Sequence, residues 1–96
     1  DPYDHLHGMV ENGFKIMINS VSCDGLDEQW LGRILDRENI KELKSLSEQY
    51  RFNVDGEGGE YETFVIGGPH LPRVLQVEGV SSFDSVRGVF TITKVH

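Results

Sequence analysis

The run of residues 56–64, GEGGEYETF, constrains this chain more than any other segment. Its first seven residues hold three glycines and three glutamates, and the apolar stretch Phe64-Val65-Ile66 follows at once. Glycine lets the backbone take positive φ angles and approach a ligand closely, whereas neighbouring carboxylates repel one another. Because stability alone does not favour three acids here, we interpret the run as a binding loop. The alternative is a solvated turn before a strand.

A strand over residues 60–66 would sort these side chains onto two faces, because successive residues of a strand point in opposite directions. One face would carry Glu60, Glu62, Phe64 and Ile66, and the other Tyr61, Thr63 and Val65. The carboxylates favour a cationic ligand, for which Tyr61 or Trp30 could supply an aromatic face. Phosphate fits less well, because the loop has no lysine and its carboxylates would repel the anion unless Mg²⁺ lay between them.

Composition narrows the classes of protein to which the chain can belong. The 96 residues are 38% apolar and carry a formal net charge of −7. One modest core is possible, and the negative charge argues against nucleic acid, which requires clustered Lys and Arg. Cys23 is the only cysteine, so no internal disulfide can form and a reducing compartment is favoured. With no signal peptide and no apolar run near the ~20 residues that cross a bilayer, we expect a cytoplasmic protein without membrane contact.

The beginning of the chain indicates a piece of a larger protein. It starts at Asp1 without a methionine, and Leu6, Met9 and Val10 resemble the last turns of a helix whose beginning is missing. Processing would produce the same start. We therefore expect residues 1–96 to be a single domain from a longer chain.

Hydrophobic periodicity predicts an alternation of helices and strands. Residues 3–12 are predicted to be helical and to end at Asn12-Gly13, and residues 14–21 form a buried strand. Asp27 would cap a short helix with Trp30, Leu31 and Ile34, in which Gly32 costs about 1 kcal/mol relative to alanine. Asp36 would cap a helix over 37–50 whose apolar stripe is Ile40, Leu43, Leu46 and Tyr50.

The second half of the chain is predicted to form mainly β-strands. A short extended segment over residues 52–55 would feed the glycine–acid loop, and strands are predicted over 60–66, 73–78 and 86–95. The last three are close enough in sequence to pair in antiparallel fashion. We expect an α/β (α+β) fold with a small mixed sheet of about four strands and two to three helices, in the order α-β-α-α-β-β-β.

Other candidate side chains carry weaker signals. Arg33 could bind a carboxylate or phosphate through its planar guanidinium, but a surface ion pair with Asp36 or Glu28 fits the spacing equally well. Trp30 fits the core better than a ligand contact. The four histidines show no metal-site spacing, and Cys23 has no evident base or second cysteine beside it.

Three segments of the chain resemble the C-terminal half of diphthine–ammonia ligases, which are N-type ATP pyrophosphatases with a PP-loop. The segments are residues 13–22 (GFKIMINSVS), 25–33 (GLDEQWLGR) and 56–65 (GEGGEYETFV). They follow one another in the family's order, and the resemblance covers about residues 5–95. The third segment is the most specific of the three.

The resemblance implies an ATP-dependent ligase. In the family an N-terminal domain binds ATP through a Ser-Gly-Gly-x-Asp-Ser loop and, with Mg²⁺, activates the carboxylate of diphthine on the translocation elongation factor as an acyl adenylate. Ammonia then displaces AMP and gives diphthamide. This chain has no PP-loop, so the resemblance implies that it binds no ATP or Mg²⁺ and catalyses nothing alone. Another carboxylate substrate for the same chemistry, or a stand-alone binding module, remain alternatives.

The implied substrate suggests roles for the acidic loop. Diphthine carries a trimethylammonium group, which is recognised by charge and aromatic faces because it donates no N–H bonds. We hypothesise that Glu57, Glu60 and Tyr61 bind or steer this cation, and that Glu62 orients the loop or accepts a proton from ammonia. The catalytic candidates are therefore Glu60 and Glu62, and no metal ligands are expected. The substrate-binding candidates are Gly56, Glu57, Gly58, Gly59, Tyr61, Thr63, Trp30 and Arg33.

Overall fold

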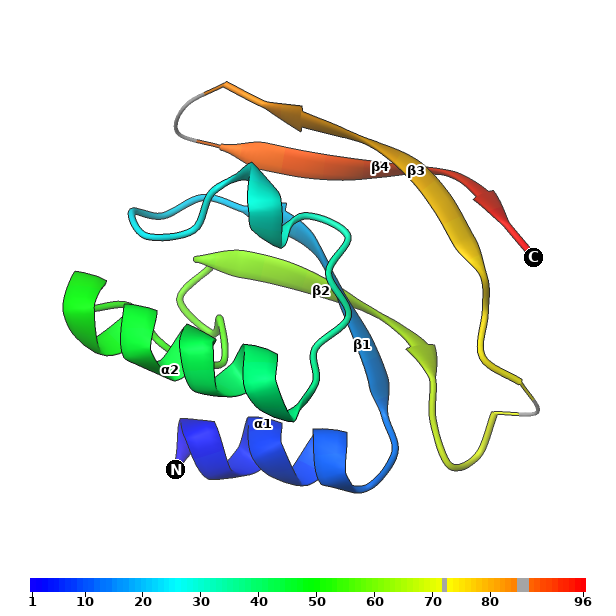
Figure 1. Cartoon of the computed structure of the whole chain (residues 1–96), viewed down its shortest axis with the longest axis horizontal. Helices are drawn as coiled ribbons and strands as arrows, with labels where there is room; N and C mark the ends of the chain where they lie inside the picture. The colour runs from blue at the N-terminus through cyan, green and yellow to red at the C-terminus, as the bar shows by residue number, and fades with distance from the viewer. Residues whose placement is uncertain (72, 85–86) are drawn as a thin grey trace.

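The computed structural model describes residues 1–71, 73–84 and 87–96 (Figure 1). The elements are α1 (Pro2–Glu11), β1 (Lys15–Val21), the 3₁₀ turn η1 (Glu28–Trp30), α2 (Arg37–Tyr50), β2 (Tyr61–Gly67), β3 (Val77–Phe83) and β4 (Gly88–Val95). The sheet has the strand order β2-β1-β4-β3. The expected α/β (α+β) class and element order are confirmed, although all three strand pairings are antiparallel and the sheet is therefore not mixed.

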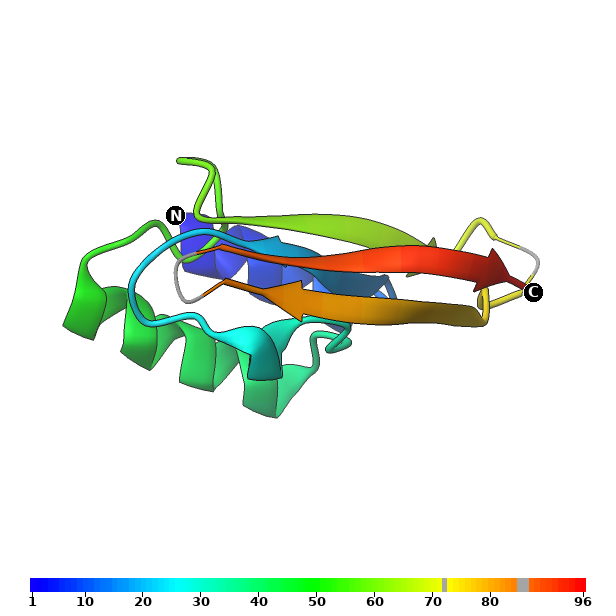
Figure 2. The ribbon, with the colours of Figure 1, turned by 90° about the horizontal axis from the view of Figure 1, so that it is seen from above.

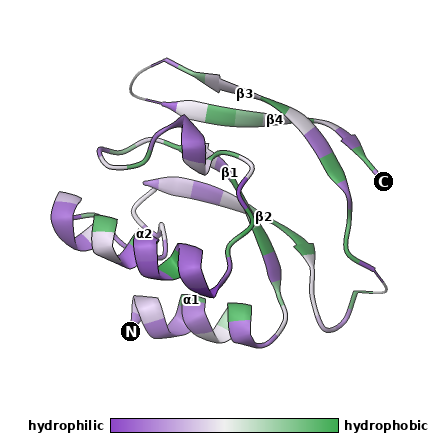
Figure 3. Ribbon diagram, viewed as in Figure 1, coloured by the Kyte–Doolittle hydropathy of each residue, from purple (hydrophilic) through white to green (hydrophobic). Residues whose placement is uncertain are grey.

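The helices lie on one side of the sheet, with α1 and α2 side by side (Figures 1 and 2). The core fills the space between them and the sheet, and Ile18, Val21, Ile40 and Leu43 are its most deeply buried side chains. Hydrophobic residues gather along β1, whereas α2 is largely hydrophilic and exposes its outer face (Figure 3). In the part of the chain that the structure describes, no helix covers the opposite face of the sheet, which we call the open face (Figure 2).

Aspartate side chains cap both main helices, and the cap at Asp36 was predicted. The Asp1 side chain accepts hydrogen bonds at the start of α1, and Asp36 Oδ1 accepts one from Asn39 N at 2.7 Å at the start of α2. The stripe of α2 is buried at Ile40 and Leu43, but Tyr50 at its end is 45% exposed. Among the described residues, no helix has the length and apolar character needed to span a membrane.

The prediction of a helix that includes Gly32 is wrong. Asp27 does cap the turn, since its Oδ1 accepts a hydrogen bond from Gln29 N at 3.0 Å, but the helical turn ends at Trp30. Gly32 has a φ angle of +79°, and a Cβ atom there would lie 3.2 Å from the ring of Phe90. The glycine therefore marks a sharp change of direction rather than a weak point inside a helix.

After this change of direction, residues 32–35 run along one edge of β1. Gly32 N donates to Ile18 O at 2.7 Å, Ile18 N donates to Arg33 O at 3.0 Å, and Leu35 N donates to Ile16 O at 2.8 Å. β4 occupies the remainder of this edge and pairs with β1 at Ser20 and Val21. The β3–β4 hairpin consequently diverges from the rest of the sheet (Figure 1).

Three further predicted segments differ from the structure by more than one residue. The strand predicted over 73–78 is instead Val77–Phe83, because Ser81 and Ser82 pair with β4 despite their polar side chains. The strand predicted over 86–95 begins at Gly88, and its first predicted residue lies outside the described residues. Val54 and Asp55 form a turn rather than an extended segment. β3 pairs with β4 as expected, whereas β2 pairs with β1 at the far side of the sheet.

Tyr61, the first residue of β2, connects the preceding loop to the core. Its ring is 4% exposed, and its hydroxyl donates a hydrogen bond of 2.6 Å to the backbone oxygen of Val54. Burial, together with the charges of Asp55 and Glu60, raises the pKa of this hydroxyl, which therefore stays protonated and keeps donating.

We expect Gly32→Ala to destabilise the chain by about 1–2 kcal/mol, because an L-residue is strained at this φ angle and its Cβ would press on Phe90. Urea unfolding followed by circular dichroism measures the change. Gly8→Ala is the matched control, since Gly8 lies inside α1 with open space around it and should stabilise by about 0.5–1 kcal/mol. Equal effects of the two variants would contradict the role assigned to Gly32.

We expect Tyr61→Phe to lower the free energy of unfolding by about 1–3 kcal/mol, because the buried oxygen of Val54 loses its donor. Tyr50→Phe removes a hydroxyl from an exposed side chain and should leave stability within about 0.5 kcal/mol. The same urea titration compares the two variants. A Tyr61→Phe protein as stable as the wild type would show that the bond to Val54 does not anchor the loop.

Candidate functional site

The glycine–acid run forms a tight loop whose end is tied to the strand beside it. Ser22 N donates to Glu60 O at 2.9 Å, and Ser22 Oγ donates to Gly59 O at 2.8 Å. Gly56 has a φ angle of +74°, and a Cβ atom there would come within 3.0 Å of the Tyr61 ring. A glycine is therefore required where the loop passes over this ring.

The Glu60 carboxylate folds back onto its own loop. Its Oε2 accepts hydrogen bonds from Asn53 N at 2.9 Å and from Asn53 Nδ2 at 3.1 Å. Burial acts to raise the pKa of Glu60, but hydrogen bonding by Asn53 and by the backbone N–H groups of Glu60 and Gly58 together outweighs this effect and holds the pKa below its ordinary value. Glu60 is thus an anion that holds residues 53–60 closed.

Glu57 lies on the helix side of the sheet, at a small pocket between α1 and β2. This pocket has a volume of about 150 Å³ and is lined by His5, Leu6, Met9, Ile16, Asp55, Glu57, Tyr61, Thr63 and Val65. Three predicted site residues, Glu57, Tyr61 and Thr63, therefore come together here. The lining is mainly apolar, with acidic residues beside it, and the contributions of Asp55 and His5 were not predicted.

Glu62 lines a different pocket, on the open face. It has a volume of about 300 Å³ and is lined by Asn19, Ser20, Ser22, Gly59, Glu62, Arg87 and Val89. Tyr61 and Thr63 line the pocket on the other face, so the predicted alternation along β2 is confirmed at these residues. The three carboxylates of the glycine–acid run do not converge. Glu57 and Glu62 line pockets on opposite faces of the sheet, and Glu60 accepts hydrogen bonds from Asn53 within the loop.

Trp30 and Arg33 lie together, away from the loop. The Trp30 ring is 3% exposed, and the guanidinium carbon of Arg33 stands 4.0 Å from its centroid. Arg33 Nη1 also forms an ion pair with Glu42 Oε1 at 3.2 Å, and not with Asp36 or Glu28. Neither residue lines the pockets that contain Glu57 and Glu62.

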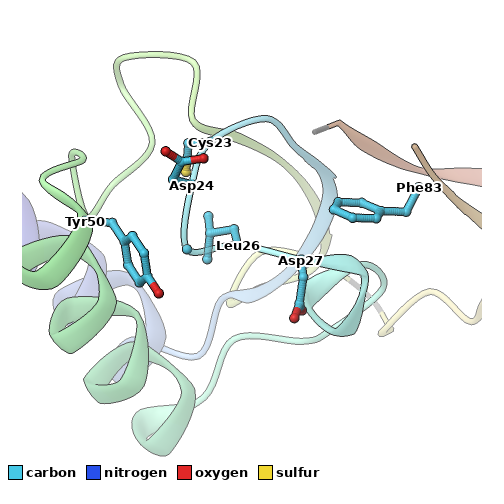
Figure 4. Close-up of a pocket in the computed structure, with 7 residues that line it drawn as sticks. Cys23, Asp24, Leu26, Asp27, Tyr50 and Phe83 are labelled. Carbon is cyan, nitrogen blue, oxygen red and sulfur yellow. The ribbon is translucent and has the colours of Figure 1, made fainter. Parts of the chain in front are cut away.

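A third pocket, of about 330 Å³, lies between the loop after β1, the end of α2 and the end of β3. In Figure 4, Tyr50 and Phe83 stand on opposite sides of Leu26, and Cys23 and Asp24 lie at the loop. Burial, and then the charges of Glu60 and Asp24, raise the pKa of Cys23 to about 11, so this thiol is protonated and unreactive at neutral pH. No pattern in the sequence predicts this pocket, because Asp24, Tyr50 and Phe83 belong to three separate parts of the fold.

The possible metal-ligating side chains are dispersed over the described part of the chain. Across residues 1–71, 73–84 and 87–96, no group of three or more His, Cys, Asp or Glu side chains is arranged to hold a metal ion. The arrangement instead offers carboxylates beside apolar or polar pockets, which suits the binding of cationic or hydrogen-bonding groups.

Comparison with known proteins agrees with the resemblance of the three segments. The family described as "Diphthamide synthase C-terminal domain" matches residues 1–96. The "Diphthine--ammonia ligase" of Homo sapiens is 38% identical over 76 residues, which cover 78% of this chain and 28% of the relative. The protein of the same name from Danio rerio is 31% identical over 98 residues, which cover 95% of this chain and 38% of the relative.

The chain therefore spans between a quarter and two fifths of the length of these curated relatives. Since the match extends over the whole sequence, the chain belongs to the family of diphthamide synthase C-terminal domains.

Proposed function

We propose that this chain is the substrate-side domain of an ATP-dependent ligase that converts diphthine on the translocation elongation factor into diphthamide, with ammonia as the nitrogen source. The match of residues 1–96 to the diphthamide synthase C-terminal family carries the proposal. Relatives named "Diphthine--ammonia ligase" at 31–38% identity support it. The reaction proceeds in the cytoplasm through an acyl adenylate, with release of AMP and pyrophosphate.

The proposal assigns ATP and Mg²⁺ to an N-terminal PP-loop domain rather than to these residues. A triphosphate does not suit the glycine–acid loop, because it contains Glu57 and Glu60 and no lysine. The domain described here contributes binding of the diphthine side chain and the environment in which its carboxylate meets the nucleotide. We expect neither direct contact with nucleic acid nor contact with a membrane.

The three carboxylates take different roles in this proposal. The Glu62 side chain has no ion pair or hydrogen bond within the described residues and lines the open-face pocket together with polar side chains of β1, so we assign it to the substrate. Glu60 positions the loop through Asn53. Glu57, next to Asp55 on the helix side, adds negative potential that attracts a cationic substrate.

Kinetic measurements of the ligase reaction with the full-length protein distinguish the role of Glu62 from that of Glu57. We expect Glu62→Gln to lower kcat/KM for diphthine-dependent AMP release about tenfold or more, because the variant loses a charge that meets the substrate. Glu57→Gln removes the same charge from the other face and should change kcat/KM less than about threefold. A larger effect of Glu57→Gln would place the substrate between α1 and β2. The absence of AMP release with diphthine in the wild type would refute the proposed function.

The positioning role of Glu60 predicts a pH-dependent loss of stability in Glu60→Gln. Because the folded state lowers the pKa of Glu60, its stabilising effect is complete above the unfolded pKa of about 4.3 and disappears as the pH falls through the folded pKa. Urea unfolding at pH 7, 5 and 3 should show a deficit relative to wild type at pH 7 that becomes smaller at pH 3. Glu48→Gln, on the exposed surface of α2, is the control and should show no such trend. A deficit that is constant with pH would contradict the role of the charge.

A further inference from the structure

The open face of the sheet carries an irregularity at the centre of the pocket that contains Glu62. The register of β1 against β2 shifts between Ile18 and Ser20, so Asn19 stands in a β-bulge. Both Asn19 and Ser20 line the pocket. The side-chain oxygen of Asn19 is buried and has no hydrogen-bond donor within the described residues. Bulges direct side chains toward sites next to a sheet, and unpaired buried polar atoms are rare in folded proteins.

Two opposite charges line the same pocket without meeting. Glu62 comes from β2, at one side of the pocket, and Arg87 comes from the turn before β4, at the other. In the described part of the chain, neither side chain belongs to an ion pair. The backbone of Arg87 is held in place, since its N–H donates to Asp84 Oδ1 at 2.8 Å and its oxygen accepts from Asp84 N at 3.0 Å.

The presence of both charges distinguishes this pocket from the other pockets of the described residues. The pocket between α1 and β2, a pocket next to it at Asp1 and the pocket beside Cys23 each include carboxylates, and none of them has a lysine or arginine among its described lining residues. A simple cation would be repelled by Arg87 and a simple anion by Glu62. A ligand that carries both charges would complement both walls, and the hydroxyls of Ser20 and Ser22 add neutral polar groups between them.

We propose that the open-face pocket binds a small zwitterion, with its ammonium group at Glu62 and its carboxylate at Arg87. The volume of about 300 Å³ leaves room for such a ligand. This inference rests on the proposed function to the extent that diphthine carries both charges close together in its side chain. A free amino acid presents the same chemistry, so the ligand class is an ammonium carboxylate and its source is decided by experiment.

Titration of the ¹⁵N-labelled chain with glycine betaine, followed by NMR, tests the proposal directly. We expect saturable shifts at the amides of Ser20, Glu62 and Val89, with a Kd on the order of 1–10 mM. Choline, which carries only the cation, and propionate, which carries only the carboxylate, should each bind about tenfold more weakly or worse. Shifts that centre on Thr63 or Tyr50, equal binding of choline or propionate, or no saturation would overturn the proposal.

Charge-removing variants test the two walls separately. Glu62→Gln and Arg87→Gln should each weaken glycine betaine about tenfold. Glu48→Gln and Arg73→Gln remove the same charges from exposed positions elsewhere and should bind as the wild type does. Unchanged binding by both pocket variants would overturn the proposal. The comparison of ligands on the wild type needs no variant, so it remains decisive should a variant unfold.

Glycine is the second zwitterionic probe, and it separates the two sources. Binding of glycine betaine at least as tight as that of glycine supports a quaternary ammonium, as in diphthine. Tighter binding of glycine supports the zwitterion site but assigns it to an amine with N–H donors, such as a free amino acid. A full-length protein that releases AMP with diphthine while the chain binds neither probe would refute this inference and leave the proposed function standing. Binding of a zwitterionic probe by the chain, without diphthine-dependent AMP release by the full-length protein, would refute the proposed function and leave the zwitterion site standing.

Discussion

The arrangement of the whole domain depends on how β1 satisfies its backbone groups along both edges. A central strand must pair on two sides, since unpaired buried amides and carbonyls are costly. β2 serves one edge of β1, and the other edge is divided between residues 32–35 and the first residues of β4. This division makes Gly32 necessary, because the chain has to leave η1 and enter the edge of the sheet at once. It also leaves β4 only a short contact with β1 and sends the β3–β4 hairpin outward.

The loop before β2 is arranged by a second set of contacts. Tyr61 fixes it to the core through Val54, Ser22 fixes it to the end of β1, and Glu60 closes it through Asn53. With Glu60 engaged in this way, the loop places Glu57 on the helix side of the sheet, and the direction of β2 places Glu62 on the open face. Residues 56–62 resemble a single acidic site in the sequence. In the structure they instead form an anchored loop and the start of a strand, with one pocket on each face of the sheet.

Local signals predicted the parts of the fold that are decided locally. Asp36 as a cap and the spacing of Ile40 and Leu43 were sufficient for α2, and the apolar run before Val21 was sufficient for β1. The sequence could not show that Gly32 ends a helix, because the reason is an edge of β1 and a ring of Phe90 far along the chain. Likewise, Ser81 and Ser82 become a strand only through their partners in β4. The third motif indicated the family, but Asn19 and Arg87 join Glu62 only after folding, so no spacing in the sequence marks that pocket.

The divergence of the hairpin has a mechanical consequence. Val89 lines the open-face pocket, and the next residue, Phe90, points to the other side of β4 and packs close to Gly32. In the described residues β4 is joined to β1 by two residue pairs, so the packing of Phe90 against Gly32 is a further contact that positions the hairpin. Since Glu62 belongs to β2 and Arg87 directly precedes β4, the position of the hairpin relative to β1 and β2 determines how far apart these two walls lie. Gly32, which has no side chain and does not line the open-face pocket, thereby influences the width of that pocket.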